Sequence, residues 1–158
     1  MRTILSAAML LTASGFAYAG QTYDSAGTIL AKSAAKIHVI SEGHMMLELP
    51  SKQTNFEMAT PNHPFAGMTG NCMGSAEVKG AAATGGGMCV YTTADGDMAV
   101  NRWTVTGVNA DGSFNGRWVM VGGNGTMKGV TGGGSYNSLT NRETGTSTIK
   151  LTGAITQP

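Results

Sequence analysis

A glycine-rich run over residues 122–136 constrains the fold of this chain more than any other feature. Seven of its fifteen residues are glycine, yet the segments on both sides alternate apolar and polar side chains as β-strands do. Glycine has no Cβ, so it tolerates the positive φ angles and close backbone contacts that occur at bulges and barrel corners. The run therefore predicts a tightly coiled antiparallel sheet. It indicates architecture more than chemistry.

The first nineteen residues have the features of a secretory signal peptide. Arg2 precedes an apolar run over residues 4–16, and Ala17, Tyr18 and Ala19 form the small-x-small pattern of a cleavage site. The run is shorter than the roughly 20 apolar residues of a transmembrane helix; a retained anchor helix is the alternative. We expect cleavage after Ala19, export to the periplasm or the medium, and a single domain over residues 20–158 without a membrane span.

The charge balance excludes some classes of partner. The chain has ten Lys and Arg against nine Asp and Glu, and removal of Arg2 with the signal peptide leaves nine of each. No cluster of basic residues is present to neutralise phosphates. We therefore expect no nucleic-acid partner and no electrostatic docking to an anionic membrane.

Cys72 and Cys89 are the only cysteines of the chain. In an oxidising compartment, an isolated pair is most simply a disulfide. Residues 72–79 and 88–93 have strand patterns, and a hairpin joined through residues 80–87 would place the two cysteines opposite each other. A redox-active or metal-binding pair is the alternative, but it lacks the C-x-x-C spacing and a neighbouring cation.

Strand patterns fill most of the exported part. Residues 26–35 alone have a composition compatible with a helix. The clearest strand covers residues 146–155, where Ile149, Leu151 and Ile155 share one face. About eight strands result, and glycine at the corners favours a closed barrel over a sandwich. The nine candidate segments, from which about eight strands are expected, are residues 36–40, 44–49, 54–59, 72–79, 88–93, 98–106, 113–121, 134–139 and 146–155.

The glycine-rich run also resembles a known signature, Gly-Gly-Thr-Gly-x-x-x-Gly-x-x-Gly-x-Gly. It belongs to small exported bacterial proteins related to allene oxide cyclase and to plant dirigent proteins. Asn124 stands where the signature has threonine. Further similar fragments are residues 43–46, 64–65, 71–74, 88–89 and 94–97 together with Trp103. The resemblance implies an eight-stranded antiparallel barrel of lipocalin-like shape, and no catalytic residue of the plant cyclases can be carried over to this sequence.

Motifs for cofactors and metals are not met. Lys128 follows Met127 rather than glycine, so the run is no phosphate-binding loop, and neither a dinucleotide fingerprint nor a Gly-x-Ser-x-Gly elbow is present. Methionine and histidine suit copper, but Met45 and Met46 point to opposite faces of a strand, so only one could join His44. We predict neither a cofactor nor a metal site.

Two sets of side chains are candidates for a functional site. One set would line a cavity and bind a ligand; it consists of Tyr91, Asn101, Trp103 and Trp118. In the alternative, the aromatic rings of this set, together with Phe114, only fill the interior of a small barrel. His44 and Glu48 share a face and would form an acid/base pair if that face looks inward. The alternative places Leu47 and Leu49 inside, with His44 and Glu48 in solvent.

Three functions remain open for such a chain. The first is a binding module that holds a small apolar or aromatic molecule. The second is a cofactor-independent isomerase or cyclase acting on an apolar substrate in the cavity. The third is a structural role in an exported complex. We expect a monomer or a small homo-oligomer.

Overall fold

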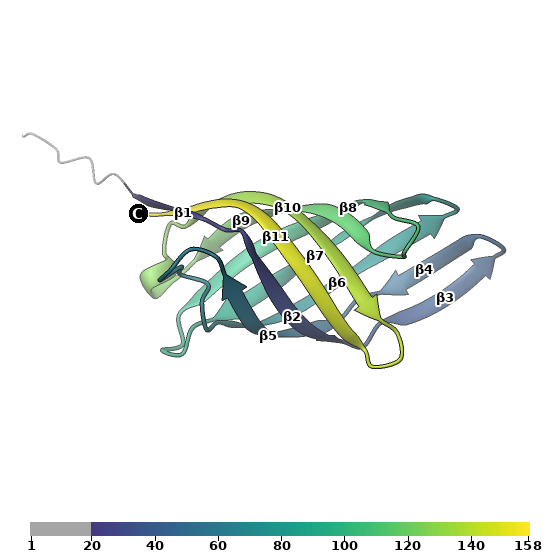
Figure 1. The fold of residues 1–158 in the computed structure, drawn as a ribbon, viewed down its shortest axis with the longest axis horizontal. Helices are drawn as coiled ribbons and strands as arrows, with labels where there is room; N and C mark the ends of the chain where they lie inside the picture. The colour runs from purple at the N-terminus through teal and green to yellow at the C-terminus, as the bar shows by residue number, and fades with distance from the viewer. Residues whose placement is uncertain (1–19) are drawn as a thin grey trace, which may run out of the picture.

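A computed structural model describes residues 20–158 and shows an all-β protein (Figure 1). The predicted signal peptide, residues 1–19, lies outside the described residues. A short 3-10 turn, η1 (Gly125–Met127), joins two of the strands. The strands in chain order are β1 (Gln21–Asp24), β2 (Gly27–Ser33), β3 (Lys36–Ser41), β4 (His44–Glu48), β5 (Ser51–Met58), β6 (Thr69–Lys79), β7 (Ala82–Thr92), β8 (Met98–Val108), β9 (Phe114–Gly123), β10 (Thr131–Asn141) and β11 (Thr146–Gln157).

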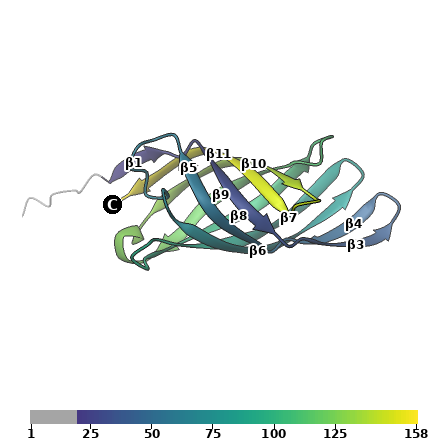
Figure 2. The same ribbon diagram turned by 60° about the horizontal axis from the view of Figure 1, so that its bottom comes forward.

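Eight of these strands close into a barrel. Their order around the ring is β6, β5, β2, β11, β10, β9, β8 and β7, and β7 pairs with β6 to close it. Each neighbouring pair is antiparallel. The turned view in Figure 2 shows the strands wrapping around a common interior. The predicted eight-stranded antiparallel barrel is confirmed.

Strand β2 corrects the prediction for residues 26–35, whose composition suits a helix. It lies between β11 and β5, with Ile29 and Ala31 buried and Leu30 on the outer face. The intrinsic helix propensities of such residues differ by less than about 1 kcal/mol, so a helix-compatible composition is only a weak preference. Two hydrogen-bonded neighbours and a buried face outweigh that difference.

The strands β3 and β4 form a hairpin outside the ring. β6 pairs with β5 through residues 70–72 and with β4 through residues 75–79, so β4 continues the sheet where β5 has left it. β3 pairs with β4 alone, and all six of its residues are exposed. The hairpin projects from one end of the barrel (Figure 1). Both segments are strands as predicted, but neither belongs to the closed ring.

The connection between β6 and β7 is shorter than predicted. The turn consists of Gly80 and Ala81, and the other three glycines of the loop expected over residues 80–87, Gly85, Gly86 and Gly87, lie within β7. Neighbouring atoms leave no room for a side chain at these positions. A Cβ on Gly85 would overlap the Ser75 carbonyl oxygen, and one on Gly87 would lie 2.5 Å from Trp103 Cζ2. Close approach of the neighbouring strands and of one large ring, rather than a loop, explains these glycines.

The glycine-rich run of residues 122–136 turns the chain at the end of the barrel. It contains the end of β9, the turn η1 and the start of β10. Gly132 has φ +121°, and a Cβ there would overlap the carbonyl oxygen of Ala154 on β11. A residue with a side chain is excluded by both conditions. The expected role of glycine at a barrel corner is confirmed at this position.

One end of the barrel is filled by side chains of a loop and a turn. Phe65, from the loop between β5 and β6, packs against Phe56, Tyr91 and Trp118 of three different strands. Met68 and Met127 are buried in the same cluster. A smaller apolar cluster at the hairpin end contains Leu47, Ala76, Val78, Ala83 and Val105. The interior between these clusters holds the candidate site.

Candidate functional site

A cavity of about 110 Å³ lies inside the barrel, and side chains from all eight strands of the ring line it. Its walls are largely apolar, with Ile29, Val105, Ile149 and Leu151 between aromatic rings. From the glycine-rich run of residues 122–136, Tyr136 lines the cavity and the preceding residues do not. The Tyr136 ring lies over Gly116 of the neighbouring strand β9. The cavity is therefore a product of ring closure, and it has no single sequence motif.

The structure brings the four predicted ligand-binding residues together. Tyr91 of β7, Asn101 and Trp103 of β8 and Trp118 of β9 all line the cavity. Phe114 lines it too. Whether these side chains bind a ligand stays a prediction, but their common orientation toward one space is a fact of the fold.

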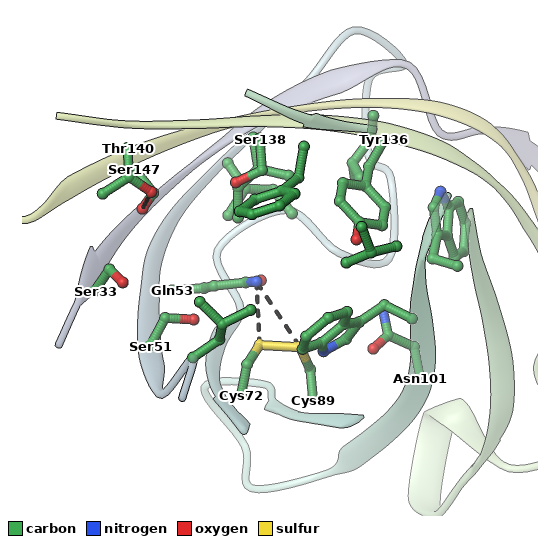
Figure 3. Close-up of a pocket in the computed structure, with 18 of the residues that line it drawn as sticks. Ser33, Ser51, Gln53, Cys72, Cys89, Asn101, Tyr136, Ser138, Thr140 and Ser147 are labelled. Atoms are coloured by element: carbon green, nitrogen blue, oxygen red, sulfur yellow. Dashed lines mark hydrogen bonds between the residues drawn. A yellow bond between two sulfur atoms is a disulfide. The ribbon is translucent and has the colours of Figure 1, made fainter. Parts of the chain in front are cut away.

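The predicted disulfide joins Cys72 and Cys89 and is confirmed. The two cysteines are direct partners in the β6–β7 register, with 4.0 Å between their Cα atoms. Both are buried in the cavity wall. Gln53 Nε2 donates a hydrogen bond to Cys72 Sγ at 3.1 Å, and Figure 3 shows the amide reaching from β5 to the disulfide.

The polar groups of the wall lie in two adjacent inward-facing rows of the sheet, where a row is a set of residues paired across neighbouring strands. One row contains Gln53 of β5, Gly70 of β6 and Tyr91 of β7. The next contains the disulfide and Asn101, which is the partner of Cys89 on β8. The Tyr91 ring occupies the space that a side chain at residue 70 would fill. As a result both amides lie next to the Tyr91 ring and the disulfide.

Asn101 Nδ2 donates a hydrogen bond to the Tyr91 hydroxyl at 2.9 Å. The oxygen ends of the two amides differ from their nitrogen ends: Gln53 Oε1 and Asn101 Oδ1 have no hydrogen-bond partner among residues 20–158. The residues are only 5% and 6% exposed. A buried, unpaired acceptor costs about 1–3 kcal/mol.

A second polar group lies at the hairpin end of the barrel. We call it the hydroxyl rim, and it consists of Ser33, Ser51, Ser138, Thr140 and Ser147. Ser33 pairs with Ser51 across β2 and β5, and the hydroxyls of Thr140 and Ser147 lie 2.7 Å apart. Figure 3 shows these side chains gathered on one side of the cavity.

No Asp, Glu, Lys, Arg or His from the described part of the chain lines the cavity. The two ionisable groups in its wall are tyrosines. Burial raises the pKa of Tyr91, with a smaller opposite effect of the neighbouring side chains Asn101 and Gln53. Burial also raises the pKa of Tyr136 to about 12. Both hydroxyls are therefore protonated and neutral at physiological pH.

His44 and Glu48 do not form the acid/base pair that an inward orientation would give. Their face of β4 looks outward, because Leu47 is buried and Leu49 lines the cavity on the opposite face. His44 Nε2 lies 2.9 Å from Glu77 Oε1, whereas Glu48 pairs with His38 at 3.0 Å. The apolar side chains of β4 thus determine which face is buried.

The carboxylates of Glu48 and Glu77 belong to ion pairs on the outer surface of the sheet formed by β3, β4 and β6. The hydrogen bond with His38 and the charge of Lys36 hold the pKa of Glu48 below its usual range. Hydrogen bonds with Lys79 and His44 lower the pKa of Glu77 in the same way. A carboxylate with a lowered pKa is a poor proton carrier near neutral pH.

Ser25 and His63 form a further buried pair, at the filled end of the barrel. His63 Nδ1 accepts a hydrogen bond from the backbone N–H of Phe65 at 3.0 Å. Its Nε2 therefore carries the proton and donates to Ser25 Oγ at 3.1 Å. A general base would have to accept the serine proton instead, and Ser25 is fully buried. The pair is structural.

Across residues 20–158 no group of three or more His, Cys, Asp or Glu side chains is arranged to hold a metal ion. The same residues include no helix of sufficient length and apolarity to cross a membrane.

Comparison with protein-family models, with curated proteins and with solved structures finds no match to this chain.

Sequence reasoning missed Gln53, Tyr136 and the hydroxyl rim. The predicted strand starts at residue 54, whereas β5 starts at Ser51. The β2–β5 register shifts between Leu30 and Ala31, so that Gln53 and Phe56, three residues apart, are both buried. This irregularity breaks the period of two by which a buried face is recognised.

Proposed function

We propose that this protein is a binding module for a small, uncharged molecule with an apolar or aromatic body. The observation that carries the proposal is a cavity inside a closed barrel, lined by aromatic rings and by no charged side chain of the described chain. Barrels of eight strands have an interior just wide enough for side chains or for one small ligand. Such pockets bind through apolar contact, and a few polar groups orient the ligand.

The size of the cavity limits the ligand. An engineered apolar cavity of about 150 Å³ accommodates benzene, and the present cavity is about 110 Å³. The buried part of a ligand is therefore about one ring in size. A longer ligand would extend past the hydroxyl rim, because Phe65 and Met68 fill the opposite end.

The alternative function, a cofactor-independent isomerase or cyclase, has less support. It needs a group that takes or gives a proton near neutral pH at the cavity. Tyr91 and Tyr136 have raised pKa values, so neither is suited to this task. His44 and Glu48 lie on the outer surface of the hairpin.

We also propose that the protein is exported and related to the bacterial group that resembles allene oxide cyclase and the dirigent proteins. The disulfide supports export, because such bonds persist mainly in oxidising compartments. Mass spectrometry of protein recovered from its own host tests the cleavage after Ala19: a mature chain beginning at Gly20 is expected, and a chain retaining residues 1–19 in the exported fraction would contradict it.

Binding of single-ring probes tests the main proposal. Phenol and toluene should change the fluorescence of the protein, since both tryptophans of the chain line the cavity. A Ser138→Phe variant should weaken binding at least about tenfold, because the new ring fills the cavity. Leu139→Phe is the matched control, on the outer face of the same strand. If neither probe binds the wild-type protein, the proposal is wrong.

A further inference from the structure

Gln53 and Asn101 are the starting point, because the fold buries both amides and leaves their oxygens without a partner in residues 20–158. More than nine-tenths of each residue is buried, and each lines the cavity. Native proteins pair nearly all buried polar atoms, so two unpaired acceptors in one small space call for an explanation.

The nitrogen ends of these amides have structural roles. Gln53 Nε2 contacts the disulfide at 3.1 Å from Cys72 Sγ, and Asn101 Nδ2 binds the Tyr91 hydroxyl at 2.9 Å. With the nitrogens engaged by the wall, the oxygen of each amide is the end left without a partner among residues 20–158. A carbonyl oxygen only accepts hydrogen bonds. The complementary ligand therefore brings N–H or O–H groups.

The surroundings also restrict the charge of the ligand. An anion would meet two acceptor oxygens and no positive side chain of the described residues in the cavity. A cation would find no carboxylate there to replace its hydration, and transfer of an unpaired charge from water is strongly unfavourable. The nearest ionisable groups, Tyr91 and Tyr136, are neutral. A neutral donor is the class that matches this wall.

We propose that Gln53 Oε1 and Asn101 Oδ1 accept hydrogen bonds from an uncharged, ring-sized ligand bearing hydroxyl or amino groups, so that the site selects donors over purely apolar rings of the same shape. This inference rests on the proposed binding function and specifies its ligand class. Trp103 and Trp118 contact the ring, and the two amides discriminate its substituents.

Three probes of similar shape separate the alternatives. Phenol donates a hydrogen bond, anisole only accepts one, and toluene does neither. The wild-type protein should bind phenol at least about tenfold more tightly than anisole or toluene, whereas benzoate should not bind. Equal affinities for phenol and toluene would overturn the inference. They would mean that the amide oxygens bind water and do not contact the ligand, so that the phenol hydroxyl adds nothing to the affinity. Preferential binding of anisole would overturn it also, since it would mean that the amides present their nitrogens.

Variants then locate the preference. Gln53→Met and Asn101→Leu keep the approximate volume and remove the acceptors, so each should lower the phenol-to-toluene affinity ratio about tenfold while toluene still binds. Asn71→Leu is the matched control, exposed on the outer face of β6, and should keep the wild-type ratio. An unchanged ratio in both cavity variants would contradict the assignment.

The outcomes also distinguish this inference from the proposed function. If no ring binds the wild-type protein, the binding function itself fails. If rings bind without regard to their donors, binding stands and only the ligand class is wrong. Where a cavity variant fails to fold, as circular dichroism would show, the comparison of the three probes on the wild-type protein still decides.

Discussion

At the level of single residues, the interior contains two kinds of buried polar group. Ser25 and His63 satisfy each other, and the remaining ring nitrogen of His63 accepts from the Phe65 backbone. Gln53 and Asn101 each leave an oxygen unpaired within the described chain. The first arrangement stabilises the filled end of the barrel, and the second is suited to recognition.

The buried histidine makes stability depend on pH. Burial lowers the pKa of His63, against a smaller opposing effect of Asp24, so the folded state favours neutral imidazole. Below about pH 6.5 the unfolded chain binds a proton that the native site resists, and stability falls. We expect the thermal midpoint to drop between pH 7 and pH 5.

A His63→Gln variant checks this pH dependence. It should be less stable at pH 7 by about 1–3 kcal/mol, since one of the two hydrogen bonds is lost. Its midpoint should change less between pH 7 and pH 5 than that of the wild type. The control His38→Gln, at an exposed site, should stay within about 0.5 kcal/mol at pH 7. A variant that keeps the whole acid-induced drop would show that other groups cause it.

At the level of elements, the long β6–β7 hairpin combines a disulfide with glycines that admit a large ring. Cys72 and Cys89 pair across its centre, and in the next inward-facing row Gly74 and Gly87 leave room for the Trp103 ring. The covalent bond thus lies beside one of the rings that line the cavity. Both features belong to the wall, so changes to either alter stability as well as the site.

Loss of the disulfide should destabilise the hairpin. A bridge that closes a loop of 17 residues stabilises the fold by roughly 3 kcal/mol in the chain-entropy model. Reduction, or a Cys72→Ala/Cys89→Ala double variant, should lower the thermal midpoint by several degrees. Calorimetry with and without reductant measures the difference. An unchanged midpoint, with both thiols shown to be free, would contradict this role.

The glycines of β7 should tolerate no side chain. Gly87→Ala places a methyl group against the Met73 carbonyl oxygen and 2.5 Å from Trp103 Cζ2, and it should cost about 1–3 kcal/mol through overpacking. Gly107→Ala is the matched control: nothing lies within 4 Å of its Cβ, so its stability should be equal or slightly higher. Denaturant titration of the two variants gives the comparison. Similar stabilities would mean that β6 and Trp103 both move to admit the methyl group, contrary to the close packing of this wall.

At the level of the whole molecule, the closed ring removes most free sheet edges, and the β3–β4 hairpin reintroduces one. Within residues 20–158 the outer edge of β3 has no partner strand, and Val39 and Ile40 are more than half exposed. Edge strands with unpaired backbone groups are the parts of a sheet that open most readily.

Amide hydrogen exchange should therefore differ between the strands of the closed ring and the free edge strand β3. Peptides from β7, which is flanked on both sides, should exchange slowly, and those from β3 should exchange within the shortest labelling times. The measurement is mass spectrometry on the protein at a concentration where it is monomeric. Equal protection of β3 and β7 would show that the free edge is covered in solution.

The closed barrel and its disulfide could be predicted from the sequence because each has a local signature. Alternation of apolar and polar residues in 146–155 indicates the strand β11. The isolated cysteine pair, with one cysteine in each of two successive strand patterns, indicates the disulfide. Asn101 and Trp103 are candidates because they share the face of a strand pattern opposite Arg102, and Tyr91 and Trp118 because their large aromatic side chains suit an apolar cavity.

The amino-acid sequence alone indicates which residues alternate, where glycine stands in place of a side chain, and which two cysteines can pair. The three-dimensional arrangement is needed to see that β2 enters the ring, that β3 and β4 lie outside it, and that Gln53 lines the cavity. The cause is that pairing partners are distant in sequence: β6 pairs with β5 over one part of its length and with β4 over another, and an irregularity between β2 and β5 shifts the phase. Local patterns cannot choose among such partners, and ring closure does.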